Sequence, residues 1–200
     1  MTNKIQEANL AMVVSKTFSG LNVNALRYLL PLWIAPLTGV TFRCVFAAVA
    51  FWIIGYWAKP ETASVKDKIY LFLLGAVGIY GYMFSYLMGL SKTTPVSAAI
   101  FTSMQPIWVF ILSVFFFNEK ATVMKIVGIL VGLGGALLCI STQKSDDLAS
   151  DAFSGNLFCL VSSVIYAVYL ILSNRFLRRT GPYTLMRYTF SGAAVSSLIV

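Results

Sequence analysis

The sequence contains no histidine, and only seven of its 200 residues are acidic. Without histidine there is no Ser-His or Cys-His nucleophile pair and no histidine ligand for a metal ion. The carboxylates all lie at or beyond the ends of long apolar runs, so no acid pair is buried within a run. These absences argue against an enzyme. They predict no catalytic residue, no metal site and no cofactor.

Charged residues are also scarce, at 11%, whereas 58% of the residues are hydrophobic. A soluble domain has about 25% charged and about 45–50% apolar residues, so this composition is typical of a protein that crosses the membrane several times. The net charge of +8 does not indicate nucleic-acid binding, because the basic residues lie between long apolar runs. The three cysteines, all inside apolar segments, do not predict a disulfide framework.

Seven apolar runs have about the 20 residues that a transmembrane helix requires. They cover approximately residues 10–30, 37–57, 69–90, 95–117, 122–141, 153–174 and 182–200. Their length and their lack of period-two alternation predict helices rather than barrel strands. Thr94 is expected to cap the fourth span, with Pro95 in its first turn. The fold class is therefore an all-α integral membrane protein.

The loop charges predict the orientation of these spans. One side of the membrane would carry Lys4, Lys59, Lys66, Lys68, Lys120, Arg178 and Arg179. The other side would carry Lys92 and Lys144, beside Asp146, Asp147 and Asp151. Because lysine and arginine accumulate on the cytoplasmic side, the N-terminus is expected inside, the 58–68 loop inside and the 142–152 loop outside. The predicted location is the plasma membrane, or the inner membrane if the cell is bacterial.

The chain also contains a weak internal repeat. An offset of 146 residues places the segment 36–53 over 182–199, with Pro36 over Pro182 and Thr38 over Thr184. The sixth and seventh spans then correspond to the first and second, so the repeating unit has five spans. A unit with an odd number of spans must reappear upside down in the membrane, which is an inverted-topology repeat.

The first span is unusually polar. With about 100° per residue on a helix, Lys16, Gly20, Asn24 and Arg27 fall within one sector about 80° wide, whereas Asn22 lies elsewhere. A lysine near the middle of a span costs roughly 2.5–3.5 kcal/mol on insertion scales. One interpretation is that the stripe forms the wall of a cavity. The other is that Lys16 and Arg27 extend to opposite membrane interfaces.

Three other spans contain candidates for the same cavity. Gln105 and Pro106 interrupt the fourth span, where the proline is expected to kink the helix. Tyr82 and Tyr86 lie on the third span, and Arg43 lies inside the second. Each has an alternative structural role. Gln105 and the tyrosines could serve helix packing, and Arg43 could pair with a backbone carbonyl. In the fifth span, the spacing of Gly128 and Gly132 predicts close approach of a neighbouring helix.

The segments 90–106 and 106–139 resemble an EamA domain of the drug/metabolite transporter superfamily. The matching features are Pro106, Glu119 just after the fourth span, and Gly128, Gly132 and Gly134 in the fifth. Arg43 stands where the family often has a basic residue. A departure is Phe18-Ser19-Gly20 in the first span, where the family often shows Trp-Gly, so a role tied to that tryptophan is not expected here.

This resemblance implies ten helices in two inverted five-helix repeats around a central cavity lined by helices one, three, four and six. It implies transport, often export, of small metabolites. The expected domains are a first EamA-like repeat at 1–142, a linker loop at 143–152 and the first two helices of a second repeat at 153–200. Three further spans are therefore expected beyond Val200, and the 200 residues are expected to be unstable and inactive without them.

The leading hypothesis is a transporter that works by alternating access, and the expected partners are a small-molecule substrate and the lipid bilayer. No nucleic-acid partner is expected, and a homodimer is left open. Basic residues facing a cavity without acids favour zwitterionic or anionic compounds such as amino acids. Glu119 is expected to cap or pair locally rather than carry protons. The alternative classes are a non-transporting membrane scaffold and a seven-span receptor, against which the inward N-terminus and the repeat both argue.

Overall fold

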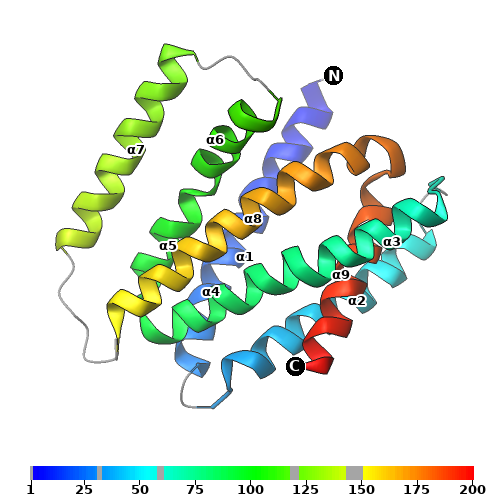
Figure 1. The fold of residues 1–200 in the computed structure, drawn as a ribbon, viewed down its shortest axis with the longest axis horizontal. Coiled ribbons are helices and arrows are strands. Elements are labelled where there is room, and N and C mark those ends of the chain that lie inside the picture. The colour runs from blue at the N-terminus through cyan, green and yellow to red at the C-terminus, as the bar shows by residue number, and fades with distance from the viewer. Residues whose placement is uncertain (1, 31–32, 58–60, 118–121, 143–150) are drawn as a thin grey trace.

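A computed structural model describes residues 2–30, 33–57, 61–117, 122–142 and 151–200, and these residues form a bundle of helices (Figure 1). The helices are α1 (Thr2–Leu29), α2 (Pro36–Trp57), α3 (Val65–Leu74), the π-helix η1 (Gly75–Ile79), α4 (Tyr80–Lys92), α5 (Pro95–Ser103), α6 (Gln105–Phe117), α7 (Val123–Thr142), α8 (Ala152–Thr180) and α9 (Pro182–Ile199). No strand occurs among these residues. The predicted all-α fold is confirmed.

Four stretches are long and apolar enough to cross a membrane by length and composition, among the residues described. They are Pro36–Trp57, Val65–Lys92, Pro95–Phe116 and Ala152–Thr180, and a shorter apolar helix covers Val123–Gly135. Helices α1 and α9 are as long as a span but more polar. The chain is therefore an integral membrane protein with several spans, two of whose helices are unusually polar.

Two of the predicted spans are not regular helices. The third span contains the π-helical segment Gly75–Ile79, which the sequence pattern did not predict. The fourth breaks at Met104, two residues before Pro106, and continues as α6. The predicted interruption is therefore present. At the start of this span, the Thr94 side chain accepts a hydrogen bond from the Ser97 N–H at 3.2 Å, as expected for a helix cap.

The core of the bundle lies between the two halves of the chain. Helix α4 packs along α8, α2 packs along α9, and α9 also crosses α3 and η1. Val40, Cys44, Leu87 and Ala193 are completely buried in this core. The apolar side chains on the outer surfaces of these helices are exposed to the surroundings, as expected for a protein whose solvent is partly lipid.

Glycine allows α9 to touch the third span backbone to backbone. A Cβ atom at Gly192 would overlap the carbonyl oxygen of Phe72, and one at Gly75 would overlap that of Thr189. Small residues bring membrane helices close in this way, because van der Waals packing drives their association where water is absent. The crossing of α9 with α3 and η1 therefore depends on two glycines that lie 117 residues apart in sequence.

The glycines that were expected to serve this purpose do not do so in the structure. No atom of a neighbouring helix lies within 4 Å of a Cβ built at Gly128, and only Ile107 approaches that of Gly132, at 3.5 Å. Helix α7 makes few contacts with the rest of the described chain. Close packing occurs instead where α9 crosses α3 and η1, and where Gly89 of α4 meets Gly155 of α8.

An acidic side chain links the loop after α2 to the start of α9. The Glu61 carboxylate accepts hydrogen bonds from the N–H groups of Thr184, at 2.7 Å, and Tyr183, at 3.4 Å. These groups have no partner within the helix, and the helix dipole favours a negative charge there. Gly181, with φ +83°, leaves the space that the Glu61 carboxylate fills. Glu61 thus caps a helix that begins 121 residues later.

A salt bridge lies at the same end of the bundle. The Arg179 guanidinium is 3.5 Å from the carboxylate of Asp67, whose side chain is only 11% exposed. The ends of α2, α3, α8 and α9 therefore meet, and this end also contains the exposed residues Lys66 and Arg178. At the opposite end of the bundle, the Lys92 ammonium donates a hydrogen bond to the Ser154 hydroxyl at 3.4 Å.

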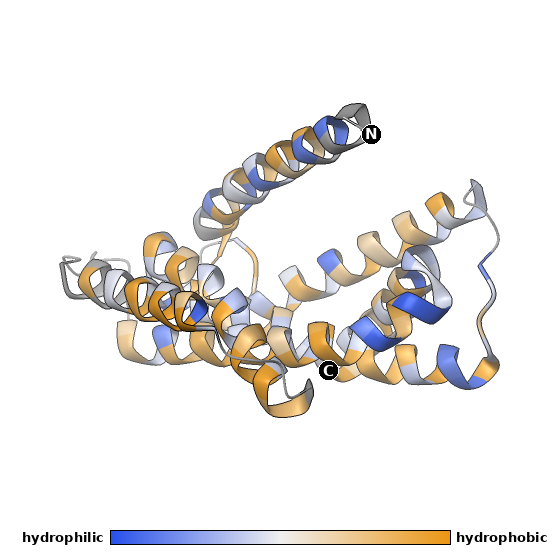
Figure 2. Cartoon of the chain, turned by 90° about the horizontal axis from the view of Figure 1, so that it is seen from above, coloured by the Kyte–Doolittle hydropathy of each residue, from blue (hydrophilic) through white to orange (hydrophobic). Residues whose placement is uncertain are grey.

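Helix α1 is attached differently from the others. Leu30, just after its C-terminal end, is buried, and Val23 and Leu26 pack partly against the core, but nearly all earlier side chains are exposed. Figure 2 shows α1 extending away from the packed helices, with hydrophilic and hydrophobic residues interspersed along it. The described helices thus form a compact set, with the polar helix α1 and the apolar helix α7 packed loosely beside it.

Candidate functional site

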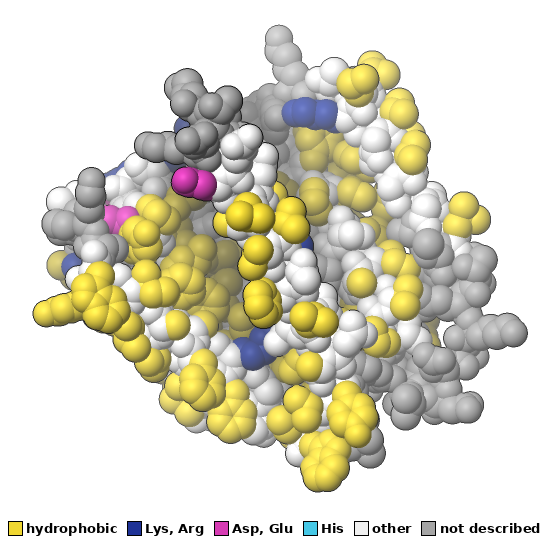
Figure 3. Space-filling view, turned by 180° about the vertical axis from the view of Figure 1, so that it is seen from behind, with side chains coloured by type: hydrophobic (Ala, Val, Ile, Leu, Met, Phe, Trp, Pro, Cys, Tyr) yellow, Lys and Arg dark blue, Asp and Glu magenta, His cyan; other side chains and the backbone are white. Residues whose placement is uncertain are grey.

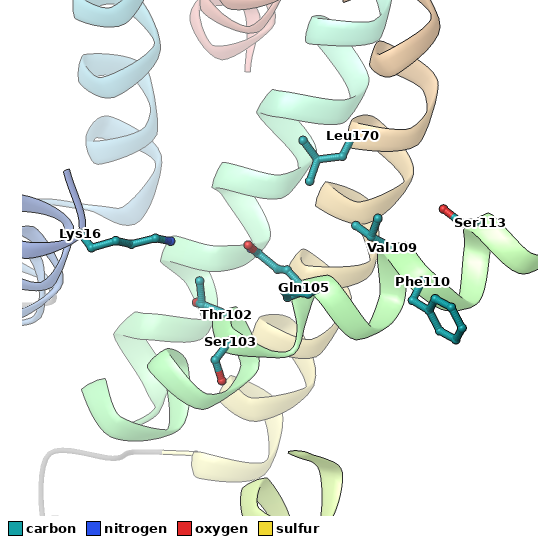
Figure 4. Close-up of a pocket in the computed structure, with 9 residues that line it drawn as sticks. Lys16, Thr102, Ser103, Gln105, Val109, Phe110, Ser113 and Leu170 are labelled. Atoms are coloured by element: carbon teal, nitrogen blue, oxygen red, sulfur yellow. The ribbon is translucent and has the colours of Figure 1, made fainter. Parts of the chain in front are cut away.

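An open cleft of about 510 Å³ separates α1 from the broken fourth span. Its lining consists of Lys16, Thr102, Ser103, Gln105, Pro106, Val109, Phe110, Ser113 and Leu170. Figure 4 shows the Lys16 side chain reaching from α1 toward Gln105 at the break between α5 and α6. The break at Met104 interrupts the apolar fourth span, and the polar side chains on either side of it therefore line the cleft.

A second hollow of about 270 Å³ adjoins the first and shares Lys16, Thr102 and Ser103 with it. The other residues that line it are Ser19, Gly20, Asn22, Val23, Arg43, Tyr82, Tyr86 and Ala99. Helix α1, behind α8 in Figure 1, faces the viewer in Figure 3, where the surface beside it is hollowed and mostly hydrophobic. The two hollows together form one open cavity between α1 and the core, with polar side chains set in a mostly apolar lining.

The cavity is positively charged. Lys16 and Arg43 line it, and the described lining residues include no carboxylate. Neither cation forms an ion pair within the described part of the chain. A cation inside a membrane protein without an acidic neighbour is costly unless water or an anionic group reaches it. The cavity is therefore suited to a negatively charged group.

Tyrosine rings form one wall of the cavity. The ring centroids of Tyr82 and Tyr86 are 6.1 Å apart, and Tyr82 lies 4.6 Å from Tyr166 of α8. Tyr166 is in turn 6.0 Å from Tyr169. These separations are typical of interacting aromatic pairs. The row of tyrosines joins the third span to α8, and two of its members, Tyr82 and Tyr86, line the cavity.

Two of these tyrosines lie against polar side chains of the broken span. Tyr82 lies beside the Gln105 side chain, and Tyr86 lies beside Thr102. The Thr102 hydroxyl donates a hydrogen bond to the Ala98 carbonyl at 2.8 Å. The polar groups at the break are thus oriented by their neighbours, and they connect the third and fourth spans.

The structure brings together most of the residues that the sequence suggested for a cavity. Lys16, Arg43, Tyr82, Tyr86 and Gln105 all line the two hollows, as does Pro106. Asn24 does not line them, and its side-chain amide donates to the carbonyl of Gly20 at 3.1 Å. The Arg27 side chain and Glu119 lie outside the described residues.

Several residues of the cavity were not identified from the sequence. Asn22 lines the second hollow, although the helical projection placed it away from the polar stripe. Ser19, Thr102, Ser103 and Ser113 were also missed, as was Tyr166, which packs against Tyr82 behind the lining. Thr102 and Ser103, just before Gln105 in "FTSMQP", could have been recognised as cavity residues, because they belong to the same polar interruption of the fourth span. For Tyr166 no sequence signal points to Tyr82, which lies 84 residues earlier.

The described residues contain no group of three or more acidic or cysteine side chains that could hold a metal ion. An all-α membrane bundle with an open, cationic cavity between its helices is typical of proteins that move or bind small molecules. The EamA-like transporter family model matches residues 6–141, which is more than half of the chain. The chain therefore belongs to the EamA-like transporter family.

Known proteins agree with this assignment. The uncharacterized transporter YyaM of Bacillus subtilis is 26% identical over 186 residues, covering 92% of this chain and 61% of that protein. The aromatic amino acid exporter YddG of Ancylobacter novellus is 28% identical over 105 residues, covering 52% of this chain and 37% of the exporter. A WAT1-related protein of Arabidopsis thaliana is 30% identical over 142 residues, or 65% of this chain and 38% of that protein.

A solved crystal structure shares the fold, with a TM-score of 0.58, 21% identity, and coverage of 93% of this chain and 66% of that one. The chain thus spans about three fifths of the length of the first two curated relatives, at 61% and 60%. The solved structure supports the fold alone, whereas the relatives YyaM and YddG are named as a transporter and an exporter.

Proposed function

We propose that this chain provides part of a transporter that moves small zwitterionic or anionic organic compounds, amino acids among them, by alternating access between inverted repeats. The observation that carries the proposal is the pair of cations, Lys16 and Arg43, in a cavity without lining carboxylates. A substrate carboxylate would supply the anionic group that these side chains lack. Charge-assisted hydrogen bonds of this kind are about twice as strong as neutral ones.

The neighbouring residues suit the rest of such a substrate. Gln105, Thr102 and the tyrosine hydroxyls can exchange hydrogen bonds with an amino or hydroxyl group. The rings of Tyr82 and Tyr86 offer aromatic surface for an apolar side chain. One relative is named as an exporter of aromatic amino acids. This supports amino acids as the first compounds to test and export as the direction.

The distribution of charge supports a cytoplasmic N-terminus in the plasma membrane. The contacts of Glu61 and Asp67 join the ends of α2, α3, α8 and α9 at one end of the bundle. The basic residues Lys66 and Arg178 lie at the same end. Basic residues of short loops accumulate on the cytoplasmic side, so this end is proposed to face the cytoplasm. Ser64 is exposed at this end, whereas Lys92 and Asp151 lie toward the other.

This orientation can be tested with an impermeant thiol reagent on intact cells that express the protein as its gene encodes it. A cysteine in place of Ser145 should be labelled, whereas a cysteine in place of Ser64 should react only after the cells are made permeable. Cys44 and Cys159 are buried, so background labelling at these two positions should be low. Labelling of the Ser64 variant alone would reverse the proposed topology.

The proposed transport is tested by a substitution at Lys16. Lys16→Met preserves the length of the side chain and removes its charge. Efflux of radiolabelled amino acids from loaded vesicles should fall about tenfold, as expected for the loss of one charge-assisted contact. Lys66→Met, which removes an exposed lysine away from the cavity, is the control and should leave efflux within twofold. Unchanged efflux in Lys16→Met would mean that Lys16 only extends to the membrane interface. Absence of transport by the parent protein, for any amino acid, would favour a scaffold.

A further inference from the structure

Arg187 lies outside the cavity and makes no ion pair or hydrogen bond through its side chain in the described part of the chain. Its guanidinium carbon is 4.3 Å from the centre of the Trp52 ring, and its Nε is buried without a hydrogen-bond acceptor. An arginine carries five N–H donors and is always charged, so a membrane protein rarely leaves it without an acceptor.

The surroundings hold this guanidinium in one place. The Trp52 indole donates to the Ser191 hydroxyl at 2.9 Å, which fixes the orientation of the ring beneath Arg187. A Cβ atom at Gly55 would lie 2.8 Å from Cδ of Arg187, so only glycine leaves space for the arginine side chain to lie across α2. The arginine is thus positioned by α2 before any ligand arrives.

A second cation lies on the same aromatic group. Trp52 is in edge contact with Tyr188, with ring centroids 6.1 Å apart, and the Lys68 ammonium lies 5.7 Å from the centre of the Tyr188 ring. Lysine, tyrosine, tryptophan and arginine therefore follow one another across α3, α9 and α2. Cation–π contacts stabilise such positions without neutralising the charge.

The acids at this end of the bundle are already engaged. Glu61 accepts the N–H groups that begin α9, and Asp67 pairs with Arg179. No other carboxylate occurs in α3, at the end of α8, in α9 or among the described residues of the loop after α2. Arg187 is the sixth residue of α9 and so lies about 7.5 Å from its first residue, at 1.5 Å per residue. This depth, with tryptophan and tyrosine beside it, matches the headgroup level of a bilayer.

We propose that Arg187, Lys68, Trp52 and Tyr188 form a binding site for the phosphate of an anionic phospholipid. Arginine binds phosphate through two parallel N–H donors, and basic pockets between membrane helices take anionic headgroups on the cytoplasmic side. A neutral, zwitterionic phospholipid would bring its own cation and gain less from the two positive charges. The site is separate from the cavity and does not depend on what the protein transports.

Lipid binding can be measured by native mass spectrometry of the protein expressed as its gene encodes it, after delipidation. Phosphatidylglycerol should remain bound at detergent conditions that remove phosphatidylcholine. Arg187→Gln should lower phosphatidylglycerol occupancy about tenfold, as expected for one charged hydrogen-bonding partner. Arg178→Gln removes an exposed arginine from the same end of the bundle and should change occupancy by less than twofold.

Two additional measurements identify the ligand and guard against misfolding. Glycerol 3-phosphate should not displace the lipid, and displacement would assign the site to a soluble phosphate compound instead. Lys68→Gln should lower occupancy about threefold while leaving helix content unchanged, because the ammonium group that it removes lies over the Tyr188 ring. The proposal would be overturned if the parent protein bound phosphatidylglycerol and phosphatidylcholine equally. It would also be overturned if phosphatidylglycerol occupancy were the same in the parent, Arg187→Gln and Lys68→Gln proteins.

Discussion

Helices α1 and α9 are the two polar helices of this bundle, but their polar residues serve different purposes. In α9, Thr184, Thr189, Gly192 and Ser197 are buried against α2, α3 and η1. In α1, by contrast, Lys16, Ser19 and Asn22 face the cavity, and most of the helix is exposed. The comparison shows that polarity in a membrane helix can support packing or line a cavity, and that composition alone does not distinguish the two.

The largest loss of stability is expected from a substitution where α9 crosses the third span, since the polar and small residues of α9 are proposed to serve packing. Gly192→Leu would drive a side chain into the carbonyl of Phe72, which cannot move without displacing α3. Overpacking against a fixed backbone should cost at least about 3 kcal/mol, enough to prevent recovery of folded protein. Size-exclusion chromatography of the purified variant in detergent provides the measurement.

Gly128→Leu is the matched control, because no neighbouring atom lies within 4 Å of a Cβ at Gly128. It should elute like the parent protein. If Gly192→Leu behaved the same way, the backbone contact between α9 and α3 would not be essential.

A smaller effect is expected from the cap on α9. Glu61→Ala removes the acceptor for the N–H groups of Thr184 and Tyr183 and should lower thermal stability by about 1–2 kcal/mol. Thr62→Ala, at the exposed neighbouring position, should change stability by less than about 0.5 kcal/mol. Thermal unfolding of both variants in the same detergent gives the comparison. An equal melting temperature for Glu61→Ala and Thr62→Ala would contradict the capping role.

On the cavity side, substitutions should affect transport more than stability. Thr102→Val is nearly isosteric but removes a hydroxyl of the cavity lining that donates to the Ala98 carbonyl and lies beside Tyr86. The loss should be about 1 kcal/mol in stability, with a severalfold rise in the KM for transport because the cavity would lose a polar group. Ser103→Ala removes a neighbouring hydroxyl that already bonds the Ile100 carbonyl and should change KM less. A larger KM change in Ser103→Ala than in Thr102→Val would show that the Thr102 hydroxyl is not the more important of the two for transport.

The smallest effect separates two asparagines of α1. Asn24→Ala breaks only a bond to the backbone of its own helix and should leave both stability and transport nearly unchanged. Asn22→Ala, in the lining of the second hollow, should alter KM while leaving expression intact. Transport is measured with the two variants side by side, and a larger effect of Asn24→Ala than of Asn22→Ala would contradict the place of Asn22 in the cavity lining.

Much of the fold could be predicted because it depends on local sequence. Apolar runs of about 20 residues define the spans, Thr94 and Pro95 mark a helix start, and Gln105-Pro106 marks an interruption. The π-helix and the Gly75–Gly192 crossing could not, because they depend on which distant helices meet. Gly128 and Gly132 have the spacing of a packing motif, yet no helix lies against Gly128 in the structure.

The candidate cavity was only partly accessible for a related reason. A projection at 100° per residue assumes that one face of the helix contacts the same surroundings along its whole length. Helix α1 packs against the core only near its C-terminal end, so no parallel neighbour defines such a face. Lys16 and Gly20 lie beside the hollow in the structure, as does Asn22, whereas Asn24 bonds the backbone of its own helix.

The cap that Glu61 forms on α9 also has a mechanical consequence. Together with the Asp67–Arg179 bridge, it ties the connection between α2 and α3 to the turn between α8 and α9. Because the ends of α2, α3, α8 and α9 are joined at one point, they cannot move independently and must rotate together as a rigid unit. Any hinge that lets these four ends move must then lie elsewhere, and the break at Met104 and the attachment of α1 near its C-terminal end are two such places in the described part of the chain.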